Sequence, residues 1–186
     1  MNIAVLYFDG FCEFELVFSY LVFAKQSIFS ISNKDKIFIS EEGQKYVVDK
    51  QIKDVNTDDI DVLIITGGDL AYLLNEKEVV DFVKEVNRKG KLIGGICGGA
   101  IFLAQIGILN GKFATGDGEG FNKNRPYANS LEGVKIKDEQ VVVDGNLITS
   151  QGIAYIEFAL KLGEITGILK NKEQIEESIK WLRNRI

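Results

Sequence analysis

Apolar segments of strand length recur along this chain, and a glycine turn and a helical pattern follow the clearest ones. Residues 61–66 precede two glycines and an amphipathic pattern over 76–88. Residues 92–96 run into a glycine-flanked cysteine and a second helical pattern. This alternation is typical of parallel strands joined by crossover helices. It predicts an α/β protein, a three-layer αβα sandwich around a mostly parallel sheet of about five or six core strands.

The other segments complete this scheme. We predict strands at 2–8, 27–32 and 113–115, an edge hairpin at 36–40 with 45–49, β segments at 135–136 and 141–143 with 147–149, and helices at 13–25, 100–106, 154–166 and 172–185. The sequence has one proline, Pro126, and no low-complexity linker. We therefore predict a single domain over residues 1–186.

The charge balance and hydropathy argue against several classes of partner. The chain has 22 Lys and Arg against 27 Asp and Glu, a net charge of −5, and no basic run to line a phosphate backbone. No apolar window reaches the roughly 20 residues that a bilayer requires. The N-terminus has no basic region or cleavage site of a signal peptide. We expect a cytoplasmic protein with no nucleic-acid or membrane partner, in which both cysteines stay as thiols.

The sequence contains no histidine. This excludes Ser-His-Asp and Cys-His catalysis in their usual forms, as well as a histidine-ligated metal. Any chemistry must use cysteine, carboxylates, hydroxyls, backbone N–H groups or lysine. We expect no metal and no cofactor.

The segment 95–99 is a G-x-C-x-G sequence at a strand end and a helix start, the context of a nucleophile elbow. There a strained backbone would present Cys97 at the carboxyl edge of the sheet, where open α/β sheets bind ligands. The N-terminus of the following helix would favour the thiolate. The alternative is a buried structural cysteine on a glycine-rich turn.

Two further features belong to the same edge. The N–H groups of Gly68 and Gly98 could form an oxyanion hole, although Gly67-Gly68 could equally be a simple turn. Glu15 follows the first strand in an apolar setting that would favour its protonated form. A protonated Glu15 could donate a hydrogen bond to the sulfur of Cys97. Its neighbour Glu13 is a commonplace partner of a helix dipole.

Six segments of the chain resemble the ThiJ/PfpI superfamily, which is class I glutamine-amidotransferase-like and includes the parkinsonism-associated deglycase. They are DGF at 9–11 with Glu15, DVLIITGG at 61–68, GICGGA at 95–100, GKFAT at 111–115, DGNLITSQG at 144–152 and EFAL at 157–160. The resemblance implies a flavodoxin-like fold, usually a homodimer, and a reactive elbow cysteine, here Cys97. It also implies that this sulfur contacts a protonated Glu15, with Gly68 and Gly98 as backbone donors.

The chain departs from the superfamily after the Ala-Thr motif. Many members have a histidine there, whereas this chain has Asp117. An exposed carboxylate is already ionised at neutral pH and is a weak general base, which puts a Cys-His mechanism in doubt. Asp117 is either a replacement catalytic residue or a solvated loop residue. Cys12 is either a structural thiol or a resolving cysteine for oxidised Cys97. Arg125 and Tyr127 line the cleft or lie on the surface.

Three functions remain open. The first is an enzyme in which Cys97 attacks a small electrophile, as the resemblance to glyoxalase-like and hydratase members implies. The second is an oxidative-stress sensor in which Cys97 becomes a sulfinate held by Glu15, without turnover. The third is a non-catalytic ligand-binding module. A short chain has little room for a cap, so we expect a small-molecule substrate.

Overall fold

The computed structural model describes residues 1–183; the predicted end of the last helix beyond Arg183 lies outside the described residues. Among the described residues the central sheet has seven strands, in the order β10-β11-β7-β6-β1-β2-β5. These strands are β1 (Asn2–Leu6), β2 (Ser27–Ser32), β5 (Lys50–Gln51), β6 (Val62–Ile65), β7 (Leu92–Ile96), β10 (Val141–Asp144) and β11 (Leu147–Ser150). Only the β10–β11 pair is antiparallel within this sheet of the described chain. The mostly parallel sheet is confirmed, and it is wider than predicted because short edge strands extend it.

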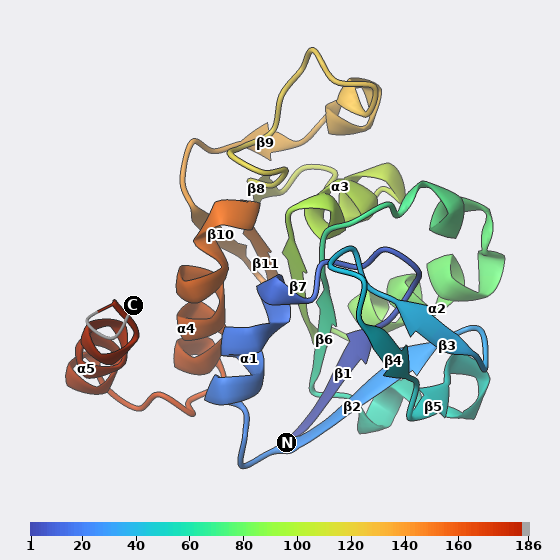
Figure 1. Cartoon of the computed structure of the whole chain (residues 1–186). Coiled ribbons are helices and arrows are strands. Elements are labelled where there is room, and N and C mark those ends of the chain that lie inside the picture. The colour runs from blue at the N-terminus through green and yellow to red at the C-terminus, as the bar shows by residue number, and fades with distance from the viewer. Residues whose placement is uncertain (184–186) are drawn as a thin grey trace.

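Helices cover both faces of this sheet (Figure 1). They are α1 (Val17–Val22), α2 (Lys77–Arg88), α3 (Gly98–Gln105), α4 (Tyr155–Ile165) and α5 (Lys172–Arg183). Two adjacent glycines of β7 show that different helices pack on the two faces of the sheet. A Cβ on Gly94 would lie 2.7 Å from Phe158 of α4, whereas a Cβ on Gly95 would lie 2.7 Å from Leu103 of α3. Successive strand residues point to opposite faces, so α3 and α4 cover opposite sides of the sheet. The predicted αβα sandwich is confirmed.

Two small sheets lie outside the central one. The predicted hairpin forms β3 (Ile37–Ile39) and β4 (Lys45–Val47), which pair antiparallel. The predicted strand at 113–115 forms β8 (Phe113–Ala114), which pairs parallel with β9 (Lys135–Ile136). Short 3-10 turns complete the chain: η1 (Phe14–Leu16), η2 (Ile52–Asp54), η3 (Thr57–Asp59), η4 (Ala71–Asn75), η5 (Ala128–Leu131) and η6 (Gly152–Ala154).

The first helix is shorter than the predicted span of 13–25. It consists of the 3-10 turn η1 followed by α1, which ends at Val22. β-branched and aromatic residues fill this segment and have lower helix propensity than Ala or Leu, so neighbouring packing decides where it ends. The consequence is that Glu15 lies in a tight turn between β1 and α1, directed at the sheet edge.

The central strands are buried on both faces, which explains their continuous apolar sequences. All four residues of β6 are buried, as are the last four residues of β1. The parallel register pairs Ile3 with Val62 and Ile65 with Gly95. The carboxyl ends of β1, β6 and β7 therefore meet at one edge. None of the helices in the described part of the chain is long and apolar enough to cross a bilayer.

Candidate functional site

Cys97 lies at the sharp turn between β7 and α3. Its backbone has φ 54° and ψ −121°, a strained conformation for a residue with a side chain. The flanking glycines are sterically required. A Cβ on Gly99 would lie 2.1 Å from the carbonyl oxygen of Ile65, and one on Gly95 would lie 2.7 Å from Leu103. The strand and helix can pass this close only without those side chains. The geometry is that of a nucleophile elbow, as the sequence predicts.

Glu15 lies on the opposite side of the same niche. Only 1% of this residue is exposed. Its Oε2 accepts a 2.6 Å hydrogen bond from the N–H of Gly67, where β6 has just ended. Its Oε1 is directed toward Cys97: a Cβ on Gly67 would lie 2.9 Å from the sulfur and 3.1 Å from Oε1. A Cβ on Gly152 would lie 3.1 Å from the sulfur and 3.2 Å from Oε1. Two glycines therefore leave the space in which the carboxyl and thiol groups meet.

The electrostatics of the pair follow from burial. Burial raises the pKa of Glu15 to about 7, against the lowering effect of its hydrogen bonds from Gly67 and Cys97. Burial, and after it the negative charge of an ionised Glu15, together raise the pKa of the Cys97 thiol to about 12. The N–H of Gly98, at the start of α3, hydrogen-bonds the sulfur and acts in the opposite direction. The favourable helix terminus that the sequence predicts is present, but burial and the carboxylate outweigh it.

The two predicted backbone donors lie side by side. The carbonyl oxygen of Gly68 would lie 3.1 Å from a Cβ on Gly98, and both glycines line a pocket of about 290 Å³. Gly68 has φ 115°, and a Cβ there would lie 2.0 Å from the carbonyl oxygen of Gly10, so only glycine fits. The sequence analysis did not identify Gly67, whose N–H binds Glu15, or Gly152, which borders the space between Glu15 and Cys97. For Gly67, the pair of glycines after β6 was a signal that the sequence offered.

Asp117 also lies at the elbow. Its N–H donates to the carbonyl oxygen of Cys97 at 3.1 Å, and its carbonyl oxygen accepts from Gly152 at 2.8 Å. Its carboxylate accepts from the N–H of Gly118 at 2.8 Å and from the hydroxyl of Tyr127. Asp117 has φ 62°, an uncommon conformation for a residue other than glycine. It is therefore a half-buried, hydrogen-bonded residue at the rim, and Tyr127 lines the pocket beside it.

Cys12 lies behind the site. Its thiol donates a 2.7 Å hydrogen bond to Glu41 at the tip of the β3–β4 hairpin, and its N–H donates to Gly67 at 3.0 Å. Burial raises the pKa of this thiol, and so does the hydrogen bond to Glu41. Both cysteines are free.

No group of three or more potential metal-binding side chains occurs within residues 1–183.

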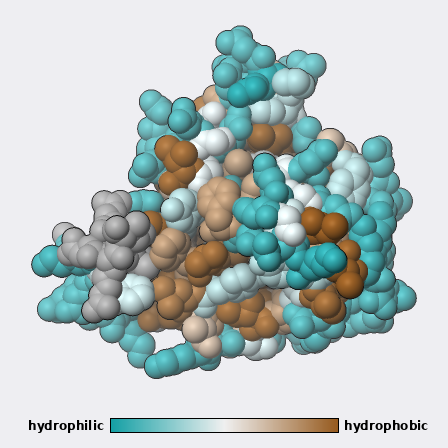
Figure 2. Space-filling model, in the orientation of Figure 1, coloured by the Kyte–Doolittle hydropathy of each residue, from teal (hydrophilic) through white to brown (hydrophobic). Residues whose placement is uncertain are grey.

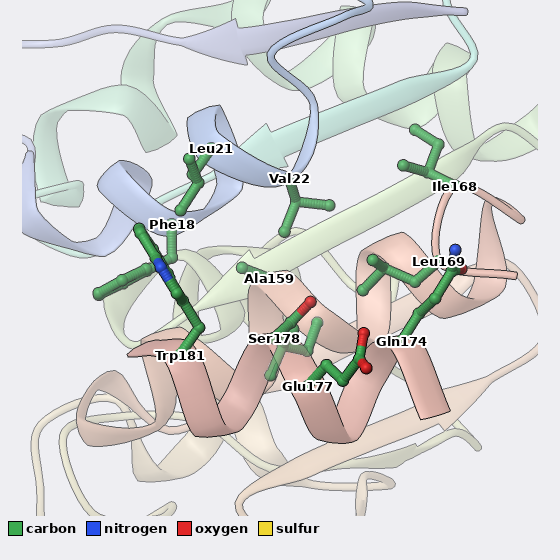
Figure 3. Close-up of a pocket in the computed structure, with 11 residues that line it drawn as sticks. Phe18, Leu21, Val22, Ala159, Ile168, Leu169, Gln174, Glu177, Ser178 and Trp181 are labelled. Atoms are coloured by element: carbon green, nitrogen blue, oxygen red, sulfur yellow. The ribbon is translucent and has the colours of Figure 1, made fainter. Parts of the chain in front are cut away.

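A larger cavity of about 560 Å³ lies elsewhere, between α1, α4 and α5. Figure 3 shows Phe18 and Leu21 of α1 beside Trp181 of α5, with Val22 farther along the cavity toward Leu169. Its walls are mostly aliphatic and aromatic, with Gln174, Glu177 and Ser178 on the α5 side. Neither Cys97 nor Glu15 lines this cavity, so the candidate site does not lie in the larger of these two cavities.

Known proteins are similar to this chain in sequence and in fold. A model of the DJ-1/PfpI family matches residues 1–165. An uncharacterized protein of Methanocaldococcus jannaschii is 37% identical over 139 residues, which are 70% of this chain and 63% of that protein, less than two thirds of its length. A protein of Pyrococcus abyssi named a deglycase is 30% identical over 155 residues, 81% of this chain and 90% of its own. The crystal structure of Drosophila melanogaster DJ-1beta matches with a TM-score of 0.80 at 26% identity, covering 97% of this chain and 96% of that one.

Proposed function

Because this chain belongs to the DJ-1/PfpI family, we propose that it is a cysteine-dependent enzyme in which Cys97 attacks a small electrophile such as an aldehyde. The observation that carries this proposal is the meeting of a strained elbow thiol with a buried carboxyl group. Oε1 of Glu15 and the sulfur of Cys97 occupy one niche beside Gly67 and Gly152. A relative named a deglycase supports the same chemistry.

In the proposed mechanism Glu15 first accepts a proton from Cys97 and later donates it to the substrate. The Cys97 thiol transfers its proton to the Glu15 carboxylate, which leaves a thiolate beside a neutral acid. The thiolate forms a bond to the carbonyl carbon, and the carbon–oxygen π electrons move onto oxygen. Glu15 then returns the proton to that oxygen, giving a neutral hemithioacetal and a carboxylate in its starting state. A Glu15 pKa of about 7 lets this group accept and return a proton at neutral pH, while the Cys97 pKa of about 12 makes the thiolate a short-lived species that reacts as it forms.

Backbone groups would stabilise the charge on the oxygen before it is protonated. The N–H of Gly98 already points at the sulfur, and Gly68 lies beside it in the 290 Å³ pocket. A pocket of this volume is at the lower limit for ligand sites, which supports a small substrate rather than a peptide. No step in this scheme requires histidine. In this scheme Asp117 is a residue of the pocket rim and takes no part in proton transfer.

The decisive test compares turnover of glyoxal, a small dialdehyde, by the wild type, Cys97→Ala and Glu15→Gln. We expect Cys97→Ala to abolish turnover and Glu15→Gln to reduce kcat by about a hundredfold, the usual worth of one proton-transfer group. Cys12→Ala is the matched control, because it removes the other thiol and should retain activity. Equal turnover by Cys97→Ala and the wild type would rule out this function.

A second candidate function is oxidative-stress sensing by the same pair. It is favoured by the contrast between a partly exposed Cys97 and a buried Cys12. Two successive reactions with hydrogen peroxide would convert the Cys97 thiolate into a sulfinate, each adding one oxygen and releasing one water. A protonated Glu15 would donate a hydrogen bond to a sulfinate oxygen. We infer a reducing compartment such as the cytoplasm, in which both thiols persist until peroxide arrives.

Peptide mass spectrometry after peroxide treatment distinguishes this sensor from an enzyme. A sensor gains two oxygens at Cys97, keeps Cys12 unmodified and turns over no aldehyde. Glu15→Gln should let oxidation continue to the sulfonate, because the sulfinate loses its hydrogen-bonding acid. If neither turnover nor selective oxidation is found, a non-catalytic binding module becomes the remaining interpretation, and Cys97→Ser would then retain ligand affinity.

We also propose that the protein forms a homodimer through the exposed apolar face of α1. Phe14, Val17 and Leu21 are each more than two-fifths exposed along one segment. Figure 2 shows apolar side chains gathered over the region of α1 and α4. Contiguous exposed apolar surface of this kind is typical of subunit interfaces. A stable dimer would bury about 800 Å² on each partner.

A further inference from the structure

Hydrogen bonds connect the segment that follows β8, residues 115–127, to the elbow around Cys97. Asp117 is bound through its N–H to Cys97 and through its carbonyl oxygen to Gly152. Its carboxylate accepts the hydroxyl proton of Tyr127, ten residues later. The Tyr127 oxygen in turn accepts the N–H of Asn122 at 3.0 Å. The residues between Asp117 and Tyr127 thus form a loop closed by one side-chain hydrogen bond.

Two residues at the end of this loop, Pro126 and Tyr127, line the pocket next to the elbow. The pocket has Gly68 and Gly98 on its elbow side, Leu70 and Ile101 as apolar walls, and Tyr127 at its rim. Its volume is about 290 Å³. Because Gly98, the residue after Cys97, lines the pocket, we expect the substituent of a molecule reacting at the sulfur to extend toward it.

The charges around this pocket are mostly negative. Asp69 is the one charged side chain among its lining residues, and it is exposed. Asp117 lies close enough to the sulfur for its charge to raise the pKa of Cys97, as Glu15 also does. Two groups near the pocket carry positive charge and oppose the effect of these negative charges. Arg125 is exposed and near Tyr127, and the N-terminus of α3 carries about half a positive charge. Solvent screens the exposed arginine, so the half-buried Asp117 has the larger effect at the elbow.

We propose that the Asp117–Tyr127 pair is a specificity-determining device: Tyr127 holds the Asp117 carboxylate beside the elbow, and that charge makes the pocket select uncharged electrophiles over anionic ones. The proposal rests on the proposed reactivity of Cys97, and it names the charge class of its substrates. It also gives Asp117, whose carboxylate accepts two hydrogen bonds, a role that requires no proton transfer.

Two alkylating reagents of similar size test the charge selection directly. Iodoacetamide is neutral and iodoacetate is anionic. Each forms a sulfur–carbon bond with the thiolate and releases iodide. The measured quantity is the ratio of their second-order rates at Cys97, followed by peptide mass spectrometry. Both reagents consume the same thiolate, so the ratio cancels any change in the pKa of Cys97. The wild type should favour iodoacetamide more strongly than a small free thiol does.

Two variants separate charge from loop structure. Asp117→Asn removes the charge but keeps an amide oxygen that can accept from the Tyr127 hydroxyl, whereas Tyr127→Phe removes the hydrogen bond and keeps the charge. We expect the preference for iodoacetamide to fall about fivefold in Asp117→Asn, the size of a Coulomb effect near a protein surface. Tyr127→Phe should lower the preference less than Asp117→Asn does, because the charge remains and only the hydrogen bond that holds it beside the elbow is lost. Glu119→Gln, which removes an exposed charge from the same loop, should match the wild type.

The outcomes are distinct. An unchanged ratio in Asp117→Asn, or an equal fall in Asp117→Asn and Tyr127→Phe, overturns the proposal and leaves the loop as a structural element. Raising the salt concentration should narrow the wild-type preference, and a salt-independent ratio would also contradict it. Failure of the proposed function appears elsewhere, as absent aldehyde turnover, because alkylation reports charge selection whether or not the protein is an enzyme.

Discussion

At the scale of single residues, the side chains that two glycines lack matter as much as the thiol and the carboxyl group of the candidate site. Gly67 and Gly152 enclose the space shared by the Cys97 sulfur and the Glu15 carboxyl group. Neither glycine has a positive φ, so the requirement for glycine there is one of space and not of backbone conformation. A residue of any other type at these positions must displace part of the reactive pair.

Gly152→Ala tests this steric requirement. The new Cβ would lie 3.1 Å from the sulfur and 3.2 Å from Oε1 of Glu15, closer than most contacts of a methyl group. We expect a loss of about 1–3 kcal/mol in the free energy of unfolding, as for other overpacked sites, and slower alkylation of Cys97 by iodoacetamide. Urea unfolding and alkylation kinetics measure the two effects. Gly118→Ala is the control, because its Cβ would meet open space; equal effects in both variants would contradict the argument.

The pH dependence of stability should report Glu15. Its pKa is raised from 4.5 in the unfolded chain to about 7 in the fold, so the folded state holds the proton more tightly. Stability is therefore greatest below the lower pKa and falls as the pH rises through this window, by about 3 kcal/mol in total. Glu15→Gln should remove this slope. Urea unfolding between pH 4 and 8 would show it as a difference between the two proteins, and parallel curves would contradict the raised pKa.

At the scale of elements, the β3–β4 hairpin caps the turn that carries Glu15. The Glu42 carboxylate at the hairpin tip accepts the N–H groups of Glu13 at 3.1 Å and Phe14 at 3.3 Å. The hydroxyl of Ser40 donates to Glu13 at 2.6 Å. The two bonds to Glu42 satisfy backbone donors that the start of η1 would otherwise leave free. The hairpin therefore helps to hold Glu15 in place, although it pairs with no strand of the central sheet.

Glu42→Ala should loosen this turn. We expect a loss of about 1 kcal/mol in the free energy of unfolding, as for other removed helix caps. We also expect faster hydrogen exchange at the amides of Glu13 and Phe14. Lys45→Ala, at an exposed position of the same hairpin, should change neither. Unchanged exchange at those two amides in Glu42→Ala would mean that the hairpin does not position the turn.

At the scale of the whole molecule, the proposed dimer would cover α1, the element next to Glu15. Leu21→Glu places a charge on the apolar face and should weaken dimerisation at least tenfold, because association would bury an unpaired carboxylate. Sedimentation velocity over a range of concentrations measures the change. Val143→Glu, at the sheet edge formed by β10, is the matched control and should leave association unchanged. Equal sedimentation of Leu21→Glu and the wild type would exclude this face as the interface.

The sequence by itself determined the fold class and the elbow. Continuous apolar strands such as 62–65 can be buried only between two helical layers, and a cysteine between glycines at a strand end has few other conformations. Local pattern also placed Glu15 at the correct edge, because that edge collects the carboxyl ends of parallel strands.

Only the tertiary structure decided which side chains meet at the candidate site and how their surroundings shift the pKa values there. Gly67 and Gly152 are 85 positions apart in the chain, and the register of β6, β7 and β11 brings them to one sulfur. The raised pKa of Cys97 follows from burial and from the Glu15 charge, which no local pattern contains. The pairing of Asp117 with Tyr127 depends on how one loop closes. Periodicity records which face of an element is buried, whereas distances between side chains of separate elements depend on packing.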